Sequence, residues 1–537
     1  MKIRVLFLLT VLVLTACSKI DNPMEEVTPT PNSTPSSTPT PSKITTTITL
    51  NLDGKVYIND KVFFLAGDAA TNIATVTSGA SVNITSSDES VVSIDGSGNI
   101  VPVGPGTATI TIAVKENLAF TAATETVTIV VGRKVSLAAE TGTEFVAQNG
   151  DQITGTAPNT MHLSIPDGAL VRLKYATIKP TTGTATAAIV CAGDATLILE
   201  GTNYATGMYG KASIQAGPEG TTLTIDGTGS IRASVLNKFS VAEIYTGAAI
   251  GSSYQEHCGN IEIKNGTITA YATPTNDLHY SLGGAGIGSG MEGSCQNITI
   301  SGGNVTARGG FGCAIGCGYK GNCKDILISG GDVDAESILG NELSGSTAAI
   351  GAANNSVCGN ITITDGTVHA ISVMNAGNYY SSGAGIGTTY GNSTCGNIII
   401  SGGTVIAQCS KNGSIAPTDN NSCGGPGIGP GGSPSPGSGN PTCGDIIITG
   451  GNVTAIGGLY SAGIGVGKTR AGKQSICGDI IITGGIVNAS GDDVEGVDDI
   501  GVGYYKTNYT IGTITVDATW NGIKGYTPTT TGYNKVP

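Results

Sequence analysis

Short apolar segments with a period of two recur throughout residues 134–516. The phrase CGNITITDGTVHA at 358–370 contains two of them, Ile-Thr-Ile and Val-His-Ala, in which apolar and polar side chains alternate. Successive side chains of a strand point to opposite faces, so each segment predicts a strand with one buried face. The Asp-Gly pair between the segments, Gly-Gly in most copies, predicts a tight turn. No long stretch has the apolar period of a helix.

The same phrase occurs seven times, and each copy opens with a cysteine. An x-Ile-Gly segment precedes each copy, so one unit contains three strand signals. Successive opening cysteines are 37, 28, 35, 37, 48 and 34 residues apart, which indicates a repeated core with loops of variable length. A propeller blade needs about 40–45 residues, more than the shortest unit offers. The pattern predicts an all-β chain in which residues 134–516 form a parallel β-helix of about eleven coils, followed by a cap or tail at 517–537.

The Gly-Ile-Gly and Cys-Gly-Asn-Ile-Thr-Ile segments resemble the repeats of bacterial cell-surface proteins. Some proteins with these repeats are carbohydrate-binding right-handed β-helices of the pectin-lyase-like superfold, and many have no assigned role. The resemblance implies a right-handed coil and leaves the activity open.

The opening cysteines are expected to form one inward-facing column, because equivalent residues of successive coils lie above one another. A line of thiols does not surround a point, as tetrahedral metal ligands must, and parallel stacked side chains are poorly placed for disulfides. A nucleophile needs one site with a base rather than seven equal copies. Packing as small buried residues is therefore favoured, with some disulfides or a metal as the alternatives. We call this set the cysteine column: Cys258, Cys295, Cys323, Cys358, Cys395, Cys443 and Cys477.

A column of Asn and Asp residues stands two positions after these cysteines. Side-chain oxygens at a corner accept hydrogen bonds from the turn backbone, and stacked copies interact along the axis. A structural role is expected for this asparagine column, which consists of Asn260, Asn297, Asp325, Asn360, Asn397, Asp445 and Asp479.

The chain begins like an exported bacterial lipoprotein. Lys2 and Arg4 precede a short apolar run and the segment LTAC, which is the arrangement of a signal peptide. The run is too short for a stable membrane-spanning helix. Its final cysteine resembles that of a bacterial lipobox, which implies a signal peptide at 1–16 and a lipidated Cys17. A plain signal peptide with an incidental cysteine is the alternative.

Residues 17–43 contain the segment TPTPNSTPSSTPTPS, in which proline favours extension and Thr and Ser keep the chain solvated. This composition predicts a semi-rigid stalk. An anchor followed by a stalk predicts a lipoprotein that is attached to a bacterial membrane through its acyl chains. The expected location is the outer membrane, with the rest of the chain exposed at the cell surface.

Residues 44–132 contain short alternating segments separated by turn signals, which is typical of a β-sandwich. The stretch SSDESVVSIDGSGNIVPVGPGTATITIAV at 86–114 resembles the bacterial Ig-like domain of group 2. Ile84 stands where that family often has an aromatic residue. The resemblance implies a spacer or adhesive module and names no ligand.

Six of the 13 cysteines lie outside the column, and four of these six lie between its first and last members. Cys313 and Cys317 flank an Ala-Ile-Gly segment, and Cys409 and Cys423 bracket a 13-residue loop. An exported compartment permits disulfides, so Cys409–Cys423 is the favoured pair. The acidic run DDVEGVDD at 492–499 is interpreted as a solvated turn, with a Ca²⁺ site as the alternative.

Composition narrows the function. The net charge is −13, so the chain lacks the basic footprint that nucleic acids require. Outward strand positions are mostly Thr, Asn or apolar, and Arg308 and His369 stand isolated. No catalytic set, metal site or cofactor motif is predicted. Enzymes on β-helices need carboxylates on an outer sheet. Polysaccharide lyases combine them with Ca²⁺ and a base, whereas glycoside hydrolases use them as a paired acid and base.

Tyrosine recurs just before the x-Ile-Gly segments, at Tyr280, Tyr380 and Tyr460. Aromatic rings along one rim form a platform for sugars, with packing of the loop onto the sheet as the alternative. The sequence thus predicts a non-enzymatic surface lipoprotein whose β-helix serves adhesion or binds a polysaccharide or cell-surface glycan. The alternative is a polysaccharide lyase or glycoside hydrolase.

Overall fold

The computed structural model describes residues 42–517 apart from 59, 78, 182–185, 209, 237–244, 273–282, 338–346, 374–382, 411–423, 434–438, 470–472, 494 and 505–508, together with 526–528 and 532–535. Nearly all its regular structure is β-strand. Within these ranges the only helical element is a 3-10 turn, Leu137–Ala139, and no helix is long and apolar enough to cross a membrane. The all-β prediction is confirmed. The predicted signal peptide, Cys17 and nearly all of the stalk lie outside the described residues.

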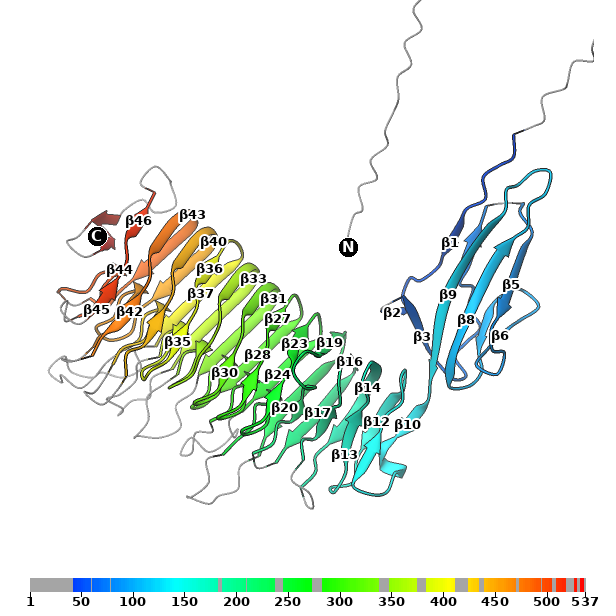
Figure 1. Ribbon diagram of the computed structural model, residues 1–537, viewed down its shortest axis with the longest axis horizontal. Helices are drawn as coiled ribbons and strands as arrows, with labels where there is room; N and C mark the ends of the chain where they lie inside the picture. Colours follow the sequence, from blue (N-terminus) through cyan, green and yellow to red (C-terminus); the bar gives the residue numbers. More distant parts are fainter. Residues whose placement is uncertain are drawn as a thin grey trace, which may run out of the picture.

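Three stacks of parallel strands build the coils, which repeat along the axis in Figure 1. The x-Ile-Gly segments form a 14-stranded sheet. Twelve of its described strands are parallel, close to the predicted eleven coils, and β48 and β47 close it in antiparallel fashion. Its strands are β11 Glu144–Val146, β13 His162–Ile165, β15 Ile189–Cys191, β18 Ile214–Gln215, β21 Ile250–Gly251, β25 Ile287–Gly288, β29 Ile315–Gly316, β32 Ile350–Ala352, β34 Ile386–Thr388, β38 Ile428–Gly429, β41 Ile464–Gly465, β44 Ile500–Gly501, β48 Tyr533–Lys535 and β47 Tyr526–Pro528.

The Ile-x-Ile and Val-x-Ala segments belong to one 18-stranded sheet, because in several coils a single long strand contains both. Its strands are β10 Lys134–Ser136, β12 Gln152–Thr156, β14 Ala169–Ile178, β16 Ala195–Glu200, β17 Thr202–Gly207, β19 Thr222–Gly227, β20 Ser230–Val235, β23 Asn260–Ile263, β24 Thr267–Tyr271, β27 Ile298–Ile300, β28 Asn304–Gly309, β31 Ile326–Ser337, β33 Ile361–Ser372, β36 Ile398–Ile400, β37 Thr404–Cys409, β40 Ile446–Ile456, β43 Ile480–Ser490 and β46 Ile514–Val516.

The cysteines that open each phrase mostly lie on a third, shorter set of strands. This set forms a three-stranded and a four-stranded sheet, with an isolated bridge at Val357 between them. Its strands are β22 His257–Cys258, β26 Ser294–Cys295, β30 Asn322–Cys323, β35 Thr394–Cys395, β39 Thr442–Cys443, β42 Ser475–Cys477 and β45 Tyr509–Ile511.

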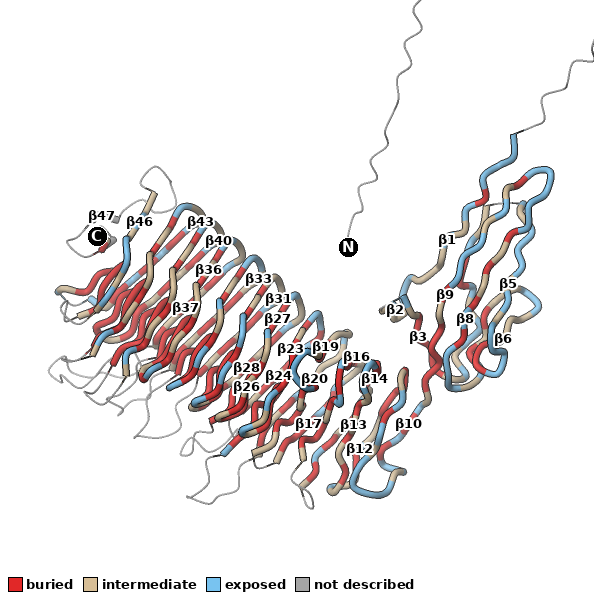
Figure 2. The backbone as a smooth tube through the Cα atoms, in the orientation of Figure 1, coloured by how far each residue is buried: buried red, intermediate tan, exposed pale blue. Residues whose placement is uncertain are grey.

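Like residues stack on like residues in the coil. Ile361 pairs with Ile398, and Ile398 pairs with Ile446 in the next coil. These inward side chains are fully buried, whereas the outward Thr362 is half-buried. Figure 2 shows the resulting alternation of buried and less buried positions along the strands. The core is therefore one continuous apolar column, as the period-two pattern predicts.

The x-Ile-Gly segment requires glycine for a steric reason. Gly387 has a φ of 135°, a conformation that side chains rarely adopt, and a Cβ there would lie 2.1 Å from the carbonyl oxygen of Gly429 in the next coil. Only a residue without a Cβ allows this approach between coils.

The asparagine column links one coil to the next. Oδ1 of Asn360 accepts a hydrogen bond from the backbone N–H of Asn397 at 2.9 Å, and Oδ1 of Asn397 accepts one from Asp445 N at 2.8 Å. These hydrogen bonds use the side-chain oxygen, and Asp445 Oδ1 likewise accepts from Asp479 N at 2.8 Å. Asn260, the first member, also donates from Nδ2 to Thr221 O at 3.2 Å. Asn and Asp are interchangeable as acceptors, which explains their mixture in the column.

Residues 44–132 form three small sheets around a separate apolar core that includes Ile110 and Ile129. β2, β3, β9, β8 and β5 form the largest sheet, β1 pairs with β4, and β6 pairs with β7. The strands are β1 Ile48–Leu50, β2 Val56–Ile58, β3 Lys61–Leu65, β4 Ala74–Val76, β5 Val82–Ser86, β6 Val92–Ile94, β7 Ile100–Pro102, β8 Gly106–Val114 and β9 Ala123–Gly132.

The N-terminal unit packs against the first coils. Only Arg133 separates β9 from β10, and its guanidinium donates to both carboxylate oxygens of the buried Asp151. Phe63 of β3 packs on Leu170 of β14, and the buried Arg172 donates from Nη2 to Phe63 O at 2.8 Å. These contacts place the β2–β3 hairpin over the outer face of the 18-stranded sheet.

Candidate functional site

The predicted tyrosine rim is described at one position only. Tyr460 is 7% exposed, its ring centroid lies 5.2 Å from that of Tyr504, and Lys468 Nζ lies 3.9 Å from the Tyr460 centroid. Tyr460 is therefore packed into the coil end and offers little ring surface to a sugar. Tyr280 and Tyr380 lie outside the described residues, so the rim stays a prediction there.

The cysteine column is stacked and buried. Cys258 pairs with Cys295 and Cys295 with Cys323, and the same register joins Cys395, Cys443 and Cys477. All seven side chains are at most 6% exposed. The Sγ atoms of Cys443 and Cys477 lie 3.5 Å apart, a thiol–thiol hydrogen bond rather than a bond of about 2.05 Å.

The pKa shifts differ along the column. Hydrogen bonds with Cys258 and Cys323, together with burial, hold the pKa of Cys295 well above its ordinary value. Burial and the neighbouring thiols do the same to the pKa of Cys443. At Cys323 burial raises the pKa, but hydrogen bonds with Cys295 and Cys317 outweigh it and lower the pKa well below its ordinary value. Because the thiolate is the reactive and metal-binding form, the raised pKa of Cys295 and Cys443 suits these two thiols to packing. Within the described ranges, no group of three or more His, Cys, Asp or Glu residues is arranged to hold a metal.

The cysteines outside the column are also buried where the structure describes them. Cys317 Sγ donates to Val357 O at 3.2 Å, and burial raises the pKa of Cys313 well above its ordinary value. Cys409 Sγ accepts a hydrogen bond from Gly425 N at 3.4 Å. Cys423 lies outside the described residues, so its pairing with Cys409 stays a prediction.

Three carboxylates of the acidic run at 492–499 accept hydrogen bonds from nearby backbone N–H groups. Asp492 Oδ2 accepts from Tyr460 N at 2.9 Å, Asp499 Oδ1 from Gly491 N at 2.7 Å, and Asp498 Oδ2 from Val502 N at 3.2 Å. Asp498 is buried rather than solvated. These carboxylates order the last turn of the coil.

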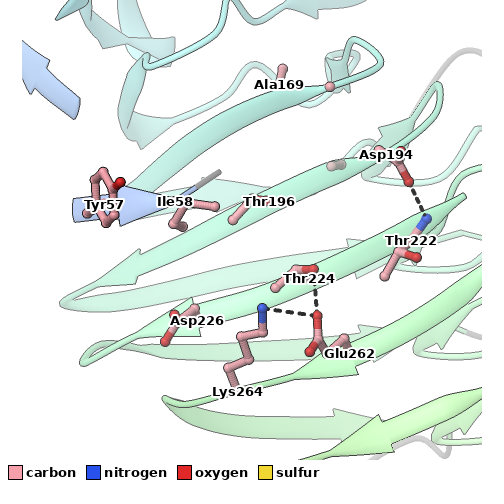
Figure 3. Close-up of a pocket in the computed structure, with 12 residues that line it drawn as sticks. Tyr57, Ile58, Ala169, Asp194, Thr196, Thr222, Thr224, Asp226, Glu262 and Lys264 are labelled. Carbon is pink, nitrogen blue, oxygen red and sulfur yellow. Dashed lines mark hydrogen bonds and ion pairs between the residues drawn. The ribbon is translucent and has the colours of Figure 1, made fainter. Parts of the chain in front are cut away.

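A groove of about 520 Å³ lies where the N-terminal unit meets the β-helix (Figure 3). We call it the junction groove. One wall is the end of β2, and the other is the outer face of β14, β16, β19 and β23. Its lining side chains are Tyr57, Ile58, Ala169, Asp194, Ala195, Thr196, Thr222, Thr224, Asp226, Glu262 and Lys264.

Polar groups of the sheet are fixed along this groove. Glu262 Oε2 accepts from Thr224 Oγ1 at 3.1 Å and lies 3.2 Å from Lys264 Nζ. Asp194 Oδ1 accepts from Thr222 N at 2.7 Å. A carboxylate has about four acceptor positions, so each of these groups retains acceptor capacity for a ligand.

An exposed aromatic ring lines the groove from the wall formed by β2. Tyr57 is 45% exposed, and its hydroxyl donates to Asp60 Oδ1 at 2.9 Å in the β2–β3 turn. That hydrogen bond raises the pKa of Tyr57. An exposed ring with hydroxyl, carboxylate and ammonium groups beside it can bind a polyhydroxylated molecule, through ring stacking and hydrogen bonds.

A second cluster lies on the outward face of β17, β20, β24 and β28, which are successive neighbours. The guanidinium carbons of Arg232 and Arg308 lie 5.3 and 5.0 Å from the ring centroid of Tyr271, and their strands β20 and β28 are the two neighbours of β24. Tyr204 pairs in register with Arg232. We call Tyr204, Arg232, Tyr271 and Arg308 the arginine–tyrosine row. The expectation that Arg308 is isolated is therefore wrong.

Neither cluster is evident in the sequence. Tyr57 and Glu262 are far apart along the chain, and no motif links them. In the row, Tyr271 and Arg308 occupy the same position of successive repeats, one residue after the Ala of Val-x-Ala. Aligning the outward positions of successive repeats is therefore the signal that finds this pair.

The parallel stack and its family likeness support a right-handed β-helix. The Beta helix repeat family model matches residues 261–291, 298–319, 361–390 and 446–465, all within the coil. No curated protein and no solved structure matches the chain.

Proposed function

We propose that this chain is a non-enzymatic lipoprotein of the bacterial cell surface whose β-helix binds carbohydrate in the junction groove. The observation that supports binding is the groove itself, which is lined on one wall by the exposed ring of Tyr57 and on the other by hydroxyl and carboxylate groups of neighbouring strands. Its volume of about 520 Å³ is within the usual range of ligand sites.

The proposed display arrangement follows the order of the chain. Residues 1–16 are a signal peptide, Cys17 is lipidated and anchors the protein to the outer membrane, and residues 17–43 are a stalk. Residues 44–132 are an Ig-like spacer, whose β2–β3 hairpin contributes a wall of the groove. The ligand is a polysaccharide or a glycan of another cell, and binding to it mediates adhesion.

Binding is favoured over catalysis by how the carboxylates are engaged. Glycoside hydrolysis needs an acid and a base or nucleophile on either side of the scissile bond. In the groove, Glu262 is paired with Lys264, and Asp194 and Asp226 accept hydrogen bonds from backbone N–H groups of their own sheet. All three lie on one wall, so they suit recognition of sugar hydroxyls.

The test combines a glycan array with a product assay on the purified chain. We expect retention of specific glycans with no new reducing or unsaturated ends. Tyr57→Ala and Glu262→Gln should each weaken binding by about ten-fold, because each removes a stacking or charged hydrogen-bonding group.

Tyr245→Ala is the matched control. Tyr245 is 44% exposed and its ring lies 4.6 Å from that of Tyr254, outside the groove. Formation of product by the purified chain would show an enzyme instead. Equal binding by Tyr57→Ala, Glu262→Gln and the control would exclude the groove as the site.

A further inference from the structure

We propose that the arginine–tyrosine row is a second binding site, which takes the anionic groups of acidic polysaccharides. The groups recognised are uronate carboxylates or sulfate esters. This inference shares with the proposed function only the premise that the chain binds carbohydrate, and it involves a different face and different residues.

The row brings two arginines together beside the acidic outward positions Asp332, Asp334 and Glu336 of β31. The chain has a net charge of −13 and six arginines, and two of those six contact Tyr271. Glu336 of β31 lies 3.0 Å from Arg308 Nε and compensates one of them. Arg232 is exposed, and no carboxylate of the described residues lies within ion-pair distance of it. The row thus keeps one uncompensated guanidinium at the surface of an acidic protein.

Tyr271 holds both guanidinium groups in place. An arginine that stacks on an aromatic face keeps its N–H groups available in a fixed, fork-like arrangement. Such a fork matches a planar carboxylate or a sulfate with two parallel hydrogen bonds. Because stacking restricts the side chains beforehand, less conformational entropy is lost when an anion binds.

Tyrosine rings extend the row and favour a sugar as the bearer of the anion. Tyr204 is 45% exposed beside Arg232. Tyr175 of the adjacent β14 is 64% exposed and lies against Gly201, where a Cβ would come within 2.4 Å of its ring. Tyrosine offers an apolar face to a pyranose ring and a polar tip to its hydroxyls.

The geometry fits a linear chain. Neighbouring strands lie about 4.8 Å apart, so the row from Tyr204 to Arg308 extends roughly 14 Å along the helix axis. A polysaccharide with regularly spaced charges can contact ring and guanidinium groups in turn. A nucleic acid needs a much wider basic surface than two arginines in a chain of net charge −13.

The test measures binding of the purified chain to polygalacturonate, to a sulfated glycosaminoglycan and to a neutral glucan. The first two distinguish carboxylate from sulfate recognition. We expect retention on at least one acidic polymer, weakened by added salt because the pairs are exposed. Arg232→Gln should reduce affinity about ten-fold or more, as expected for a charged hydrogen bond. Tyr271→Leu should have a similar effect, whereas Tyr271→Phe keeps the ring face and should bind like the parent.

Lys320→Gln is the matched control, because Lys320 Nζ also lies over a tyrosine ring, at 5.2 Å from the Tyr319 centroid, on another part of the coil. All these side chains lie on the surface, and far-UV circular dichroism verifies the fold of each variant. If Arg232→Gln binds the acidic polysaccharides as tightly as the parent protein does, the proposal is overturned. Equal binding of single-stranded DNA, lost in the same variants, also overturns it, since the row would then attract any polyanion.

The two sites fail in distinguishable ways. Loss of acidic binding in Arg232→Gln with intact binding of a groove ligand supports two sites. Loss of acidic binding in Tyr57→Ala but not in Arg232→Gln assigns acidic glycans to the groove and overturns this inference. Retention of no polysaccharide of any kind overturns both proposals.

Discussion

Replacing Gly387 by alanine tests whether close approach between coils holds the β-helix together. Gly387 lies in β34 and pairs with Gly429 of β38 in the next coil. Its φ of 135° is in a region that is nearly restricted to glycine, and the added Cβ would lie 2.1 Å from Gly429 O and 2.8 Å from Gly429 C. Both atoms are backbone, so a side-chain rotation cannot relieve the contact.

The expected cost has two parts. A non-glycine residue in such a backbone conformation costs about 1–3 kcal/mol. Moving the coils apart to relieve the contact also strains neighbouring hydrogen bonds, such as that from Ile386 N to Gly427 O at 2.9 Å, each worth about 1 kcal/mol. We therefore expect the free energy of unfolding to fall by about 3–5 kcal/mol.

Gly168→Ala separates the two parts. Gly168 has a φ of 71°, and a Cβ there would meet no atom within 4 Å. This variant should lose only the cost of the left-handed backbone, about 1–2 kcal/mol. Gly96→Ala in the N-terminal unit has open space and an ordinary φ, so it should be neutral.

The measurement is urea unfolding followed by far-UV circular dichroism, with the midpoint and slope fitted for each variant. The order of stability should be Gly96→Ala, then Gly168→Ala, then Gly387→Ala as the least stable. If Gly387→Ala unfolded within about 1 kcal/mol of Gly168→Ala, contact between the coils at the x-Ile-Gly segments would not limit stability, and the steric reasoning would be refuted.

Four further predictions concern packing and charge. Asn397→Leu removes the hydrogen-bond acceptor for Asp445 N and should lower the free energy of unfolding in urea by about 1–2 kcal/mol. Asn397→Asp keeps the accepting oxygen and should lower it less. Equal losses in the two variants would contradict the acceptor role. Burial raises the pKa of Cys191 to about 12, so this thiol ionises first in the unfolded chain, and stability that is present below about pH 9 is lost as pH rises towards 12. The loss at pH 10.5 amounts to about 2 kcal/mol. Urea unfolding at about pH 8 and about pH 10.5 should show this loss in the parent protein, and Cys191→Ala should lack the part of the loss that is due to Cys191. Asp151→Asn weakens the paired hydrogen bonds with Arg133 and should lower the free energy of unfolding by about 2 kcal/mol. An unchanged midpoint of urea unfolding would be evidence against a stabilising role for this pair. A bulky maleimide should leave the cysteine column unlabelled in the native protein and label it after unfolding, as quantified by mass spectrometry.

The sequence was sufficient for the architecture of the coil because its determinants are local and repeated. Alternation in Ile361–Thr362–Ile363 identifies the inward face, and the fixed distance to the next Val-x-Ala segment identifies the turn. Repetition then predicts like-on-like stacking, which the register of Ile361 with Ile398 confirms. The separate strand of the cysteines was not anticipated, because two residues are too few for an alternation to be recognised.

The surface sites depended on the tertiary structure. Tyr460 follows the same loop pattern as Tyr280 and Tyr380, yet it is packed against Tyr504. Loops of variable length connect the strands, so a shared sequence position in a loop does not imply a shared exposure.

The sequence by itself determined an all-β repeat with apolar residues and thiols inside, because alternation and spacing are properties of single strands. Tertiary structure decided which distant side chains meet. Stacking of the coils brought Arg232 and Arg308 from the two neighbouring strands to Tyr271, and packing of the N-terminal unit placed Tyr57 in the same groove as Glu262. These contacts arise between residues tens to hundreds of positions apart, whose proximity depends on the pitch of the coil and on the docking of the two units.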